Sequence, residues 1–391
     1  MNRPSVGLGL LLVSIALLLP ACTANTNGEA TMPETPQQQS PPPAAPDATV
    51  ATPPKPDMEM QAVLDQLAKL GGKPIETLTP EEARKQPTPA DAVKALLQSQ
   101  GKPTAPEPVA KVSNRTFPGA GGAVPIRIYM PAPMADQGAP PRADADKQTW
   151  PVVLYIHGGG WVIADLDTYD ASARALANRA QAIVVSTHYR QGPEHMFPAA
   201  HEDTLAAYQW VLKNAASLGG DPRKIALVGE SAGGNMAANI AIAARDRKWQ
   251  APLHQVLVYP VADNDLNSPS YQENANAKPL NKAMIEWFVK HYVGAPEKTA
   301  DPRIALVKTP DLKGVAPATI VLAQIDPLRS DGEKYAARLR ESGVPVELKT
   351  YDGVAHEFFG MGAAVDKAKQ AQAFVGERLR AAWATPSPET D

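Results

Sequence analysis

A glycine-flanked serine is the group in this chain best placed to act as a nucleophile. Ser231 stands within Gly-Glu-Ser-Ala-Gly-Gly-Asn at residues 229–235, directly after the apolar run 225–228. At a sharp turn from strand to helix the serine takes strained backbone angles, and the flanking glycines let the helix pack against the strand. The competing interpretation is a phosphate-binding loop at a helix N-terminus. It is weakened because the segment has neither a Gly-x-Gly-x-x-Gly pattern nor a following lysine.

A second glycine-rich turn offers a partner for this nucleophile. It follows the apolar run 151–156 and reads His-Gly-Gly-Gly-Trp at residues 157–161. Three successive glycines let backbone N–H groups approach a ligand with no Cβ in the way. Two such donors and the N–H of Ala232 would stabilise the negative oxygen that develops on an ester carbonyl, and one such donor is worth about 3–4 kcal/mol. The competing interpretation of this turn is a flexible loop, but the two turns together favour an oxyanion hole.

The elements that must position these turns alternate between strand and helix from about residue 109 onward. This alternation indicates a mostly parallel, doubly wound α/β sheet, and several runs are wholly apolar, as strands covered on both faces must be. In such sheets ligands bind beyond the carboxyl ends of the strands, where both turns lie. Strands are expected at 126–130, 152–156, 183–187, 225–228, 256–259, 320–322 and 346–351, and helices near 169–180, 199–216, 232–245, 334–342 and 364–382.

Taken together, these motifs resemble the hormone-sensitive-lipase-like branch of the α/β hydrolases, often called bacterial family IV esterases. Tyr-Arg-Gln-Gly-Pro-Glu-His at 189–195 matches that family's Tyr-Arg-x-x-Pro-Glu-His, and Phe-Pro-Ala-Ala follows at 197–200. Asp326, in Asp-Pro-Leu, and His356 stand where the family's acid and base are expected. The resemblance covers roughly residue 109 to the C-terminus, with a looser match from Met60.

The resemblance implies an α/β-hydrolase fold, with a catalytic domain at 109–391 and a helical cap. The cap would comprise the N-terminal helices at 58–108 and an insertion at about 262–300. The implied activity is that of a serine carboxylester hydrolase, with a Ser231–His356–Asp326 triad, acting on short to medium acyl esters. The implied oxyanion hole comprises Gly159, Gly160 and Ala232, and the implied support of its loop comprises His157 and Gly158.

Chain order independently favours His356 as the base. The chain has seven histidines, and only His356 follows both the last expected strand and Asp326, as the order nucleophile, acid, base requires. For the acid, Asp331 and Asp352 also lie between Ser231 and His356. Asp326 is preferred because it directly leaves the strand at 320–322, whereas Asp331 opens the next helix and Asp352 sits in a turn. Glu230, beside the nucleophile, is expected to make a supporting contact.

Two departures from the family pattern bear on the substrate pocket. Gln191-Gly192 replaces the common Leu-Ala, and Glu357 follows His356 where glycine is usual. The aromatic residues Trp287, Phe288 and Tyr292 lie in the expected cap, either to contact the substrate or to form an apolar helix face. The same triad also serves amidases and β-lactam hydrolases, and a non-catalytic binding module is a further alternative. The intact triad and glycine loop argue against the latter.

The first residues predict targeting. Arg3 is followed by an apolar run at 6–19, too short to cross a bilayer as a helix, so a signal peptide is expected. Leu-Pro-Ala-Cys at 19–22 resembles a bacterial lipobox, which makes Cys22 the expected lipidation site and residues 1–22 the signal peptide. The alternative is cleavage after Ala24. Because Thr23 is not aspartate, we expect retention at the outer membrane.

The segment that follows is expected to be a tether. Residues 23–57 are rich in Pro, Ala, Thr and Gln and cannot bury enough apolar surface to fold. Two amphipathic helices come next, one with apolar positions between Met60 and Leu70 and one opening at 88–91. These are the helices that the resemblance assigns to the cap.

Composition limits the partners and cofactors. A formal net charge of −3 with 20% charged residues is that of an ordinary folded protein and does not favour nucleic acid as a partner. No His, Cys and carboxylate set has metal-ligand spacing, so neither metal nor cofactor is expected. The expected partner is a small-molecule ester, with membrane attachment only through the lipid on Cys22. The sole cysteine leaves no disulfide within the chain, and the oligomeric state is left open.

Overall fold

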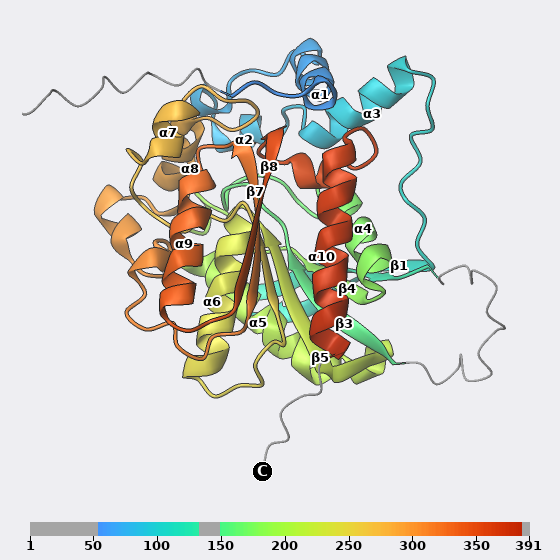
Figure 1. Ribbon diagram of the computed structural model, residues 1–391, viewed down its shortest axis with the longest axis vertical. Coiled ribbons are helices and arrows are strands. Elements are labelled where there is room, and N and C mark those ends of the chain that lie inside the picture. The colour runs from blue at the N-terminus through green and yellow to red at the C-terminus, as the bar shows by residue number, and fades with distance from the viewer. Residues whose placement is uncertain (1–53, 133–148, 385–391) are drawn as a thin grey trace, which may run out of the picture. The chain divides into compact units, whose positions relative to one another are not determined.

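The computed structural model describes residues 54–132 and 149–384 (Figure 1). The predicted signal peptide, Cys22 and nearly all of the predicted tether lie outside these residues. None of the helices in the described ranges is both long and apolar enough to cross a membrane.

The core is an eight-stranded sheet in the order β1-β2-β4-β3-β5-β6-β7-β8. The pairs β1·β2 and β2·β4 are antiparallel, and all the other neighbours are parallel. The predicted α/β fold with a mostly parallel sheet is thus confirmed. The strands are β1 (Lys111–Gly119), β2 (Gly122–Met130), β3 (Trp150–Ile156), β4 (Ile183–Thr187), β5 (Gly220–Glu230), β6 (Gln255–Val258), β7 (Ala318–Ile325) and β8 (Val346–Ala355).

Strand β1 is absent from the strands expected from the sequence. It lies at the edge of the sheet, and among its residues only Phe117 is buried. An edge strand with so few buried positions has no apolar pattern by which to recognise it. The central strands behave oppositely: Val152, Leu154 and Ile156 pack in one core, while Val153 and Tyr155 pack in the other. Both faces of β3 are therefore buried, which explains its unbroken apolar sequence.

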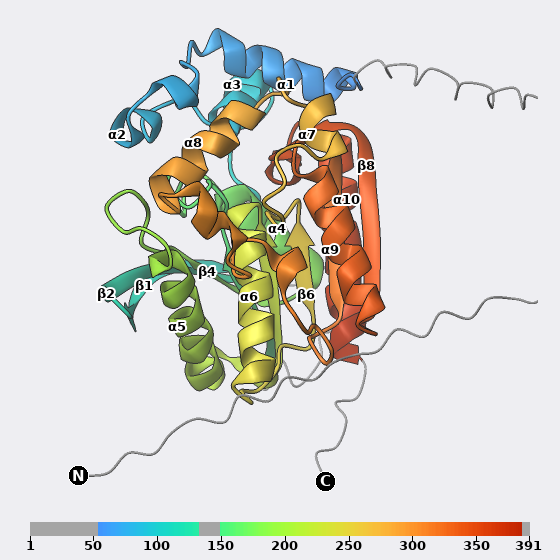
Figure 2. The same cartoon turned by 90° about the vertical axis from the view of Figure 1, so that its left-hand side faces the viewer.

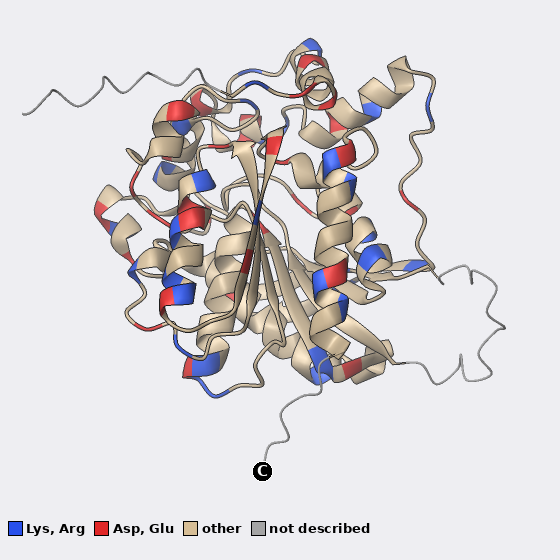
Figure 3. Cartoon of the chain, in the orientation of Figure 1, with Lys and Arg blue, Asp and Glu red and all other residues tan. Residues whose placement is uncertain are grey.

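Helices cover both faces of the sheet (Figure 1, Figure 2). One face carries α4 (Asp170–Ala180) and α10 (Asp366–Ala384), and the other carries α5 (Ala199–Asn214), α6 (Ala232–Asp246) and α9 (Arg329–Glu341). Lys, Arg, Asp and Glu are interspersed along α9 and α10 (Figure 3). Helix α9 begins five residues before the predicted start at 334, and a Cβ at Gly332 would lie 2.4 Å from the Leu322 side chain. Its first turn thus packs on β7 through a glycine, not through a periodic apolar face.

A set of shorter helices lies beyond the carboxyl ends of the parallel strands (Figure 2). Helices α1 and α3 match the two amphipathic segments expected before the sheet, whereas η1 and α2 between them were not anticipated. Thr88 caps α3 in a reciprocal capping box with Asp91. The indole N–H of Trp287, in α8, donates to the Leu78 carbonyl at 3.0 Å, so the N-terminal segment packs on the later insertion. The elements are α1 (Met58–Lys69), η1 (Ile75–Thr77), α2 (Pro80–Ala83), α3 (Pro89–Ser99), α7 (Pro269–Glu273) and α8 (Lys282–Tyr292).

Candidate active site

Ser231 occupies the strained turn between β5 and α6. Its backbone has φ 56° and ψ −120°, outside the ordinary regions for a residue with a side chain. A Cβ at Gly229 would lie 2.1 Å from the Gly233 carbonyl oxygen, and a Cβ at Gly233 would lie 2.1 Å from the Ile156 carbonyl oxygen. Both flanking positions therefore need glycine, for the steric reason expected from the sequence.

The three residues predicted as a triad lie in one hydrogen-bonded chain. His356 Nδ1 donates to Asp326 Oδ2 at 2.6 Å, which leaves Nε2 to accept from the Ser231 hydroxyl at 3.0 Å. All three side chains are buried. The second carboxylate oxygen of Asp326 accepts from the Leu328 N–H at 2.8 Å, which fixes the carboxylate at the end of β7.

The two other aspartates considered as the acid lie elsewhere. Asp331 is buried, and its carboxylate accepts from the backbone N–H groups of Ala262 and Asp263 at 3.0 Å each, so it anchors the loop that opens the insertion. Asp352 is exposed on β8. Neither is hydrogen-bonded to His356 in the described residues. The arrangement therefore favours Asp326.

The charges around His356 favour its protonated form. Burial by itself lowers the pKa of this imidazole, but the charge and the hydrogen bond of Asp326, with smaller contributions from Glu357 and Glu230, raise it above its ordinary value. A raised pKa means that the imidazolium formed after proton abstraction is stabilised. The geometry can thus move a proton from Ser231 to His356.

The glycine loop after β3 lies against the nucleophile. A Cβ at Gly158 would lie 3.1 Å from Ser231 Cβ and 2.4 Å from the Tyr169 hydroxyl. Gly159 and Gly160 have φ of 93° and 57°, values that favour glycine. Within the described residues, the backbone N–H groups of Gly159, Gly160 and Ala232 donate no hydrogen bond to the protein. Three free donors beside a serine suit an incoming oxyanion.

His157, the first residue of this loop, fixes its conformation through hydrogen bonds. Its Nδ1–H donates to the Gly158 carbonyl at 2.9 Å, its Nε2 accepts from His188 Nδ1 at 3.0 Å, and its ring stacks on Tyr189 at 4.4 Å. Burial, reinforced by His188, lowers the pKa of His157 to about 3. The ring therefore stays neutral. Among the described residues its hydrogen bonds go to Gly158, His188 and Tyr189, whereas Ser231 is bonded to His356. This placement suits the supporting role expected for it.

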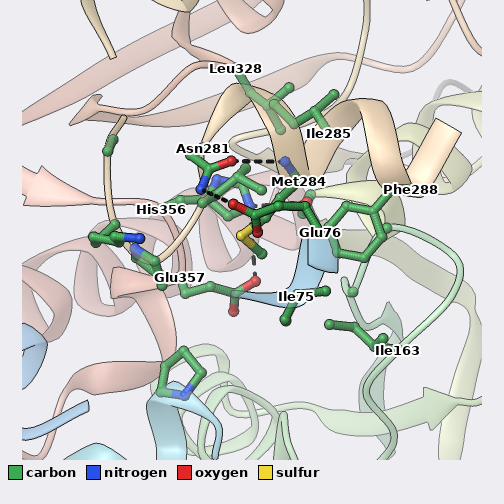
Figure 4. Close-up of a pocket in the computed structure, with 18 of the residues that line it drawn as sticks. Ile75, Glu76, Ile163, Asn281, Met284, Ile285, Phe288, Leu328, His356 and Glu357 are labelled. Carbon is green, nitrogen blue, oxygen red and sulfur yellow. Dashed lines mark hydrogen bonds and ion pairs between the residues drawn. The ribbon is translucent and has the colours of Figure 1, made fainter. Parts of the chain in front are cut away.

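A cavity of about 1560 Å³ opens onto Ser231 and His356. Cap residues from η1 and α8 form much of its wall, including Ile75, Met284 and Phe288 (Figure 4). Of the three cap aromatics considered as substrate contacts, Phe288 lines the cavity. Trp287 instead donates to Leu78, and the Tyr292 hydroxyl lies 2.9 Å from His201 Nδ1, so both serve the packing of the cap.

One departure from the family pattern has a packing reason here. A Cβ at Gly192 would lie 2.4 Å from the His291 carbonyl oxygen, so the end of α8 approaches this loop too closely for the usual alanine. The neighbouring Gln191 lines the cavity and donates to the carbonyls of Ile163 and Ala164 at 2.8 and 2.9 Å. Its side chain fixes the segment after the glycine loop at 157–161.

The chain is similar to known ester hydrolases in sequence and in structure. Residues 153–360 match the family model described as alpha/beta hydrolase fold. Carboxylesterase NlhH of Mycobacterium tuberculosis is 40% identical over 292 residues, 73% of this chain and 88% of that protein. The ethyl acetate hydrolase of Pseudomonas putida is 34% identical over 328 residues, 83% of this chain and 98% of that protein. The chain belongs to the α/β-hydrolase family.

A solved esterase structure has the same fold as most of this chain. The hyperthermophilic esterase of the archaeon Pyrobaculum calidifontis superposes with a TM-score of 0.73 at 32% identity, covering 85% of this chain and all of that one. The fold implied by the sequence resemblance is therefore confirmed.

Glu230 is buried next to Ser231 and supports the candidate active site. Its carboxylate accepts from the hydroxyls of Tyr155 and Tyr259 at 2.5 Å each, and the Tyr259 ring lies 4.4 Å from the His356 ring. The sequence predicted a supporting contact for Glu230, but the two tyrosines are brought in by β3 and by the end of β6. The two tyrosines meet Glu230 only in the folded chain, and no local sequence motif predicts their role.

Replacing Glu230 with glutamine should flatten the pH dependence of stability. Burial raises the pKa of Glu230 from 4.5 to about 7, with Glu357 adding to the effect. The folded state thus holds this proton more tightly than the unfolded chain, and the stability so gained is present below about pH 4.5 and lost as pH rises through 7. Between pH 5 and 8 the free energy of unfolding should therefore fall by roughly 3 kcal/mol less in Glu230→Gln than in the unmutated protein. Urea unfolding at each pH measures this difference. The exposed Glu297→Gln is the control, and equal slopes in all three proteins would contradict the assignment.

Proposed function

We propose that the chain is a serine carboxylesterase that hydrolyses short to medium acyl esters by two-step acyl transfer. Its membership of the family and its esterase relatives support ester hydrolysis. The observation that carries the mechanism is the chain of hydrogen bonds from Ser231 through His356 to Asp326, open to a cavity large enough for an organic ester.

In the first step Ser231 attacks the ester carbonyl while His356 Nε2 takes the hydroxyl proton. Asp326 keeps the imidazole in the tautomer that leaves Nε2 free and stabilises the imidazolium that forms. The carbonyl oxygen becomes an oxyanion, which the N–H groups of Gly159, Gly160 and Ala232 would hold. His356 then gives its proton to the leaving alcohol oxygen, and the acyl group stays on Ser231.

In the second step water replaces the alcohol. His356 takes a proton from the water as it attacks the acyl-enzyme, the same oxyanion hole holds the second tetrahedral intermediate, and the acid is released with Ser231 restored. Every proton moves between Ser231, His356, water and substrate, so the cycle needs no group beyond these side chains and backbone donors.

The preferred acyl-chain length should distinguish this enzyme from lipases that act on long-chain fats. Cap elements form much of the cavity wall, and Phe288 would lie 2.2 Å from a Cβ on Gly160, so this part of the wall packs directly against the glycine loop at 157–161. With p-nitrophenyl esters of two to sixteen carbons, kcat/KM should peak at or below about ten carbons and fall at least roughly ten-fold by sixteen, about 1.4 kcal/mol. Efficient cleavage of emulsified long-chain triglyceride, with activation at the interface, would contradict this. A nitroanilide and a β-lactam in the same assay test the amidase and lactamase alternatives.

For the N-terminus we propose a lipid anchor on Cys22, with the enzyme held at the outer membrane and the cap at 58–108 and 262–300 kept clear by the tether. Each buried CH₂ adds about 0.8 kcal/mol, so a multiply acylated cysteine holds permanently. About 35 residues of Pro-rich chain reach on the order of 100 Å when extended. Palmitate should label the unmutated protein in the membrane fraction, and Cys22→Ser should lose the label. Unlabelled, soluble activity in both proteins would instead indicate cleavage after Ala24.

A further inference from the structure

Glu357, directly after the catalytic histidine, is an unusual residue for its backbone. It has φ 69°, in the left-handed region that favours glycine. Its carboxylate accepts from the Tyr169 hydroxyl at 2.6 Å and lies 3.9 Å from His356 Nε2. The side chain is 21% exposed and lines the cavity. A carboxylate thus occupies a strained backbone position and faces the cavity.

A second carboxylate reaches the same cavity from the N-terminal segment. Glu76, in η1, accepts from the Asn281 side-chain amide at 3.2 Å through one oxygen. Its other oxygen is buried and has no hydrogen-bond partner within the described residues. Figure 4 shows both Glu76 and Glu357 among the side chains around the pocket, together with His356. Neither carboxylate forms an ion pair with a lysine or arginine among the described residues.

The other charged residues of the cavity wall are either paired with an opposite charge or exposed to solvent. Asp263 pairs with Lys334 and Glu273 pairs with Arg329. Arg84 is held by Glu194 at 2.7 Å. The remaining lysines and carboxylates that line the cavity are exposed: Lys73, Lys278, Lys290, Asp65, Asp165 and Glu286. The partly buried, uncompensated charge of the described wall is therefore negative, and it lies beside the catalytic base.

We propose that Glu357, together with Glu76, selects esters whose alcohol portion carries a positive charge, such as a quaternary or primary ammonium group. This inference rests on the proposed esterase function, because the position of the alcohol portion is inferred from the step in which His356 protonates the leaving alcohol. His356 Nε2 must reach the leaving alcohol oxygen to protonate it. A carboxylate 3.9 Å from that nitrogen is consequently a neighbour of the alcohol portion.

The energetics favour a cationic occupant over an anionic one. Burial raises the pKa of Glu357, and the Tyr169 hydroxyl and His356 offset this only in part. A cation entering the cavity would restore the interactions that the carboxylate loses on leaving water. A charge-assisted contact of this kind is worth roughly a ten-fold change in affinity or more. An anionic alcohol portion would instead meet two carboxylates.

Three acetate esters test the selectivity: acetylcholine, its uncharged isostere 3,3-dimethylbutyl acetate, and 3-acetoxypropanesulfonate, each followed by titration of the released acid at constant pH. In the unmutated enzyme kcat/KM should fall in that order. Glu357→Gln keeps an acceptor for Tyr169 but removes the charge, and it should reduce the acetylcholine to 3,3-dimethylbutyl acetate ratio roughly ten-fold. Glu76→Gln should reduce the ratio in the same direction. Glu297→Gln removes an exposed charge that does not line the cavity and should leave the ratio unchanged.

The outcomes separate this inference from the esterase proposal. An enzyme that hydrolyses p-nitrophenyl acetate but shows the same ratio before and after Glu357→Gln remains an esterase, and the role of Glu357 is then wrong. An enzyme that hydrolyses none of these esters overturns both. Should the variants fail to fold, inhibition of the unmutated enzyme decides: choline should inhibit p-nitrophenyl acetate hydrolysis more strongly than 3,3-dimethylbutanol, and equal or weaker inhibition overturns the inference.

Discussion

Replacing Ser231 with alanine is expected to lower kcat for ester hydrolysis by roughly 10⁴- to 10⁶-fold without unfolding the protein. In the proposed mechanism the Ser231 hydroxyl carries the acyl group, while the change removes a single oxygen from a buried site. Initial rates with p-nitrophenyl butyrate, combined with thermal unfolding, separate lost chemistry from lost structure.

The loss should not deepen when His356 is removed as well. Nucleophile and base act as a unit, so Ser231→Ala combined with His356→Ala should be little worse than Ser231→Ala alone, with His356→Ala alone similarly damaging. Near-normal turnover by folded Ser231→Ala would overturn the proposed mechanism.

Asp326→Asn should lower kcat by about 10⁴-fold. The asparagine amide can donate to His356 Nδ1, which favours the tautomer with its proton on Nε2, where the Ser231 proton must go. The carboxylate charge that raises the pKa of His356 is also lost. The acid limb of kcat/KM, which reports deprotonation of free His356, should have its midpoint above the ordinary 6.5 in the unmutated enzyme and at lower pH in the variant.

Asp352→Asn is the matched control for this change. Asp352 also lies between Ser231 and His356 in the chain, but its side chain is exposed, so activity and pH profile should stay close to those of the unmutated enzyme. A large loss in Asp352→Asn with an active Asp326→Asn would transfer the role of acid to the other aspartate.

The candidate catalytic motifs could be predicted from the sequence because each depends on residues close together in the chain. The turn around Ser231 and the loop at 157–161 need glycine for steric reasons within a few residues, and chain order then points to His356. The central strands were predictable for a related reason, since burial on both faces leaves unbroken apolar runs. The edge strand β1, which buries almost nothing, lacks that signal.

What the sequence did not predict depends on contacts between distant segments. Tyr169 and Glu357 are 188 residues apart, and Asn281 and Glu76 are 205 residues apart, yet both pairs meet at the cavity. Glu357 was visible only as a departure from the family pattern. That it lines the cavity, and that a second carboxylate from the N-terminal segment lines the same cavity, follows from the tertiary packing.

Covalent labelling tests the central claim, that Ser231 is the acylated nucleophile, most directly. A fluorophosphonate should inactivate the enzyme with one phosphonyl group per active site, and mass spectrometry of the digested protein should locate that group on Ser231. Labelling should vanish in Ser231→Ala and persist in Asp352→Asn. An active enzyme that resists the reagent, or one whose adduct lies on any other residue, would contradict the account.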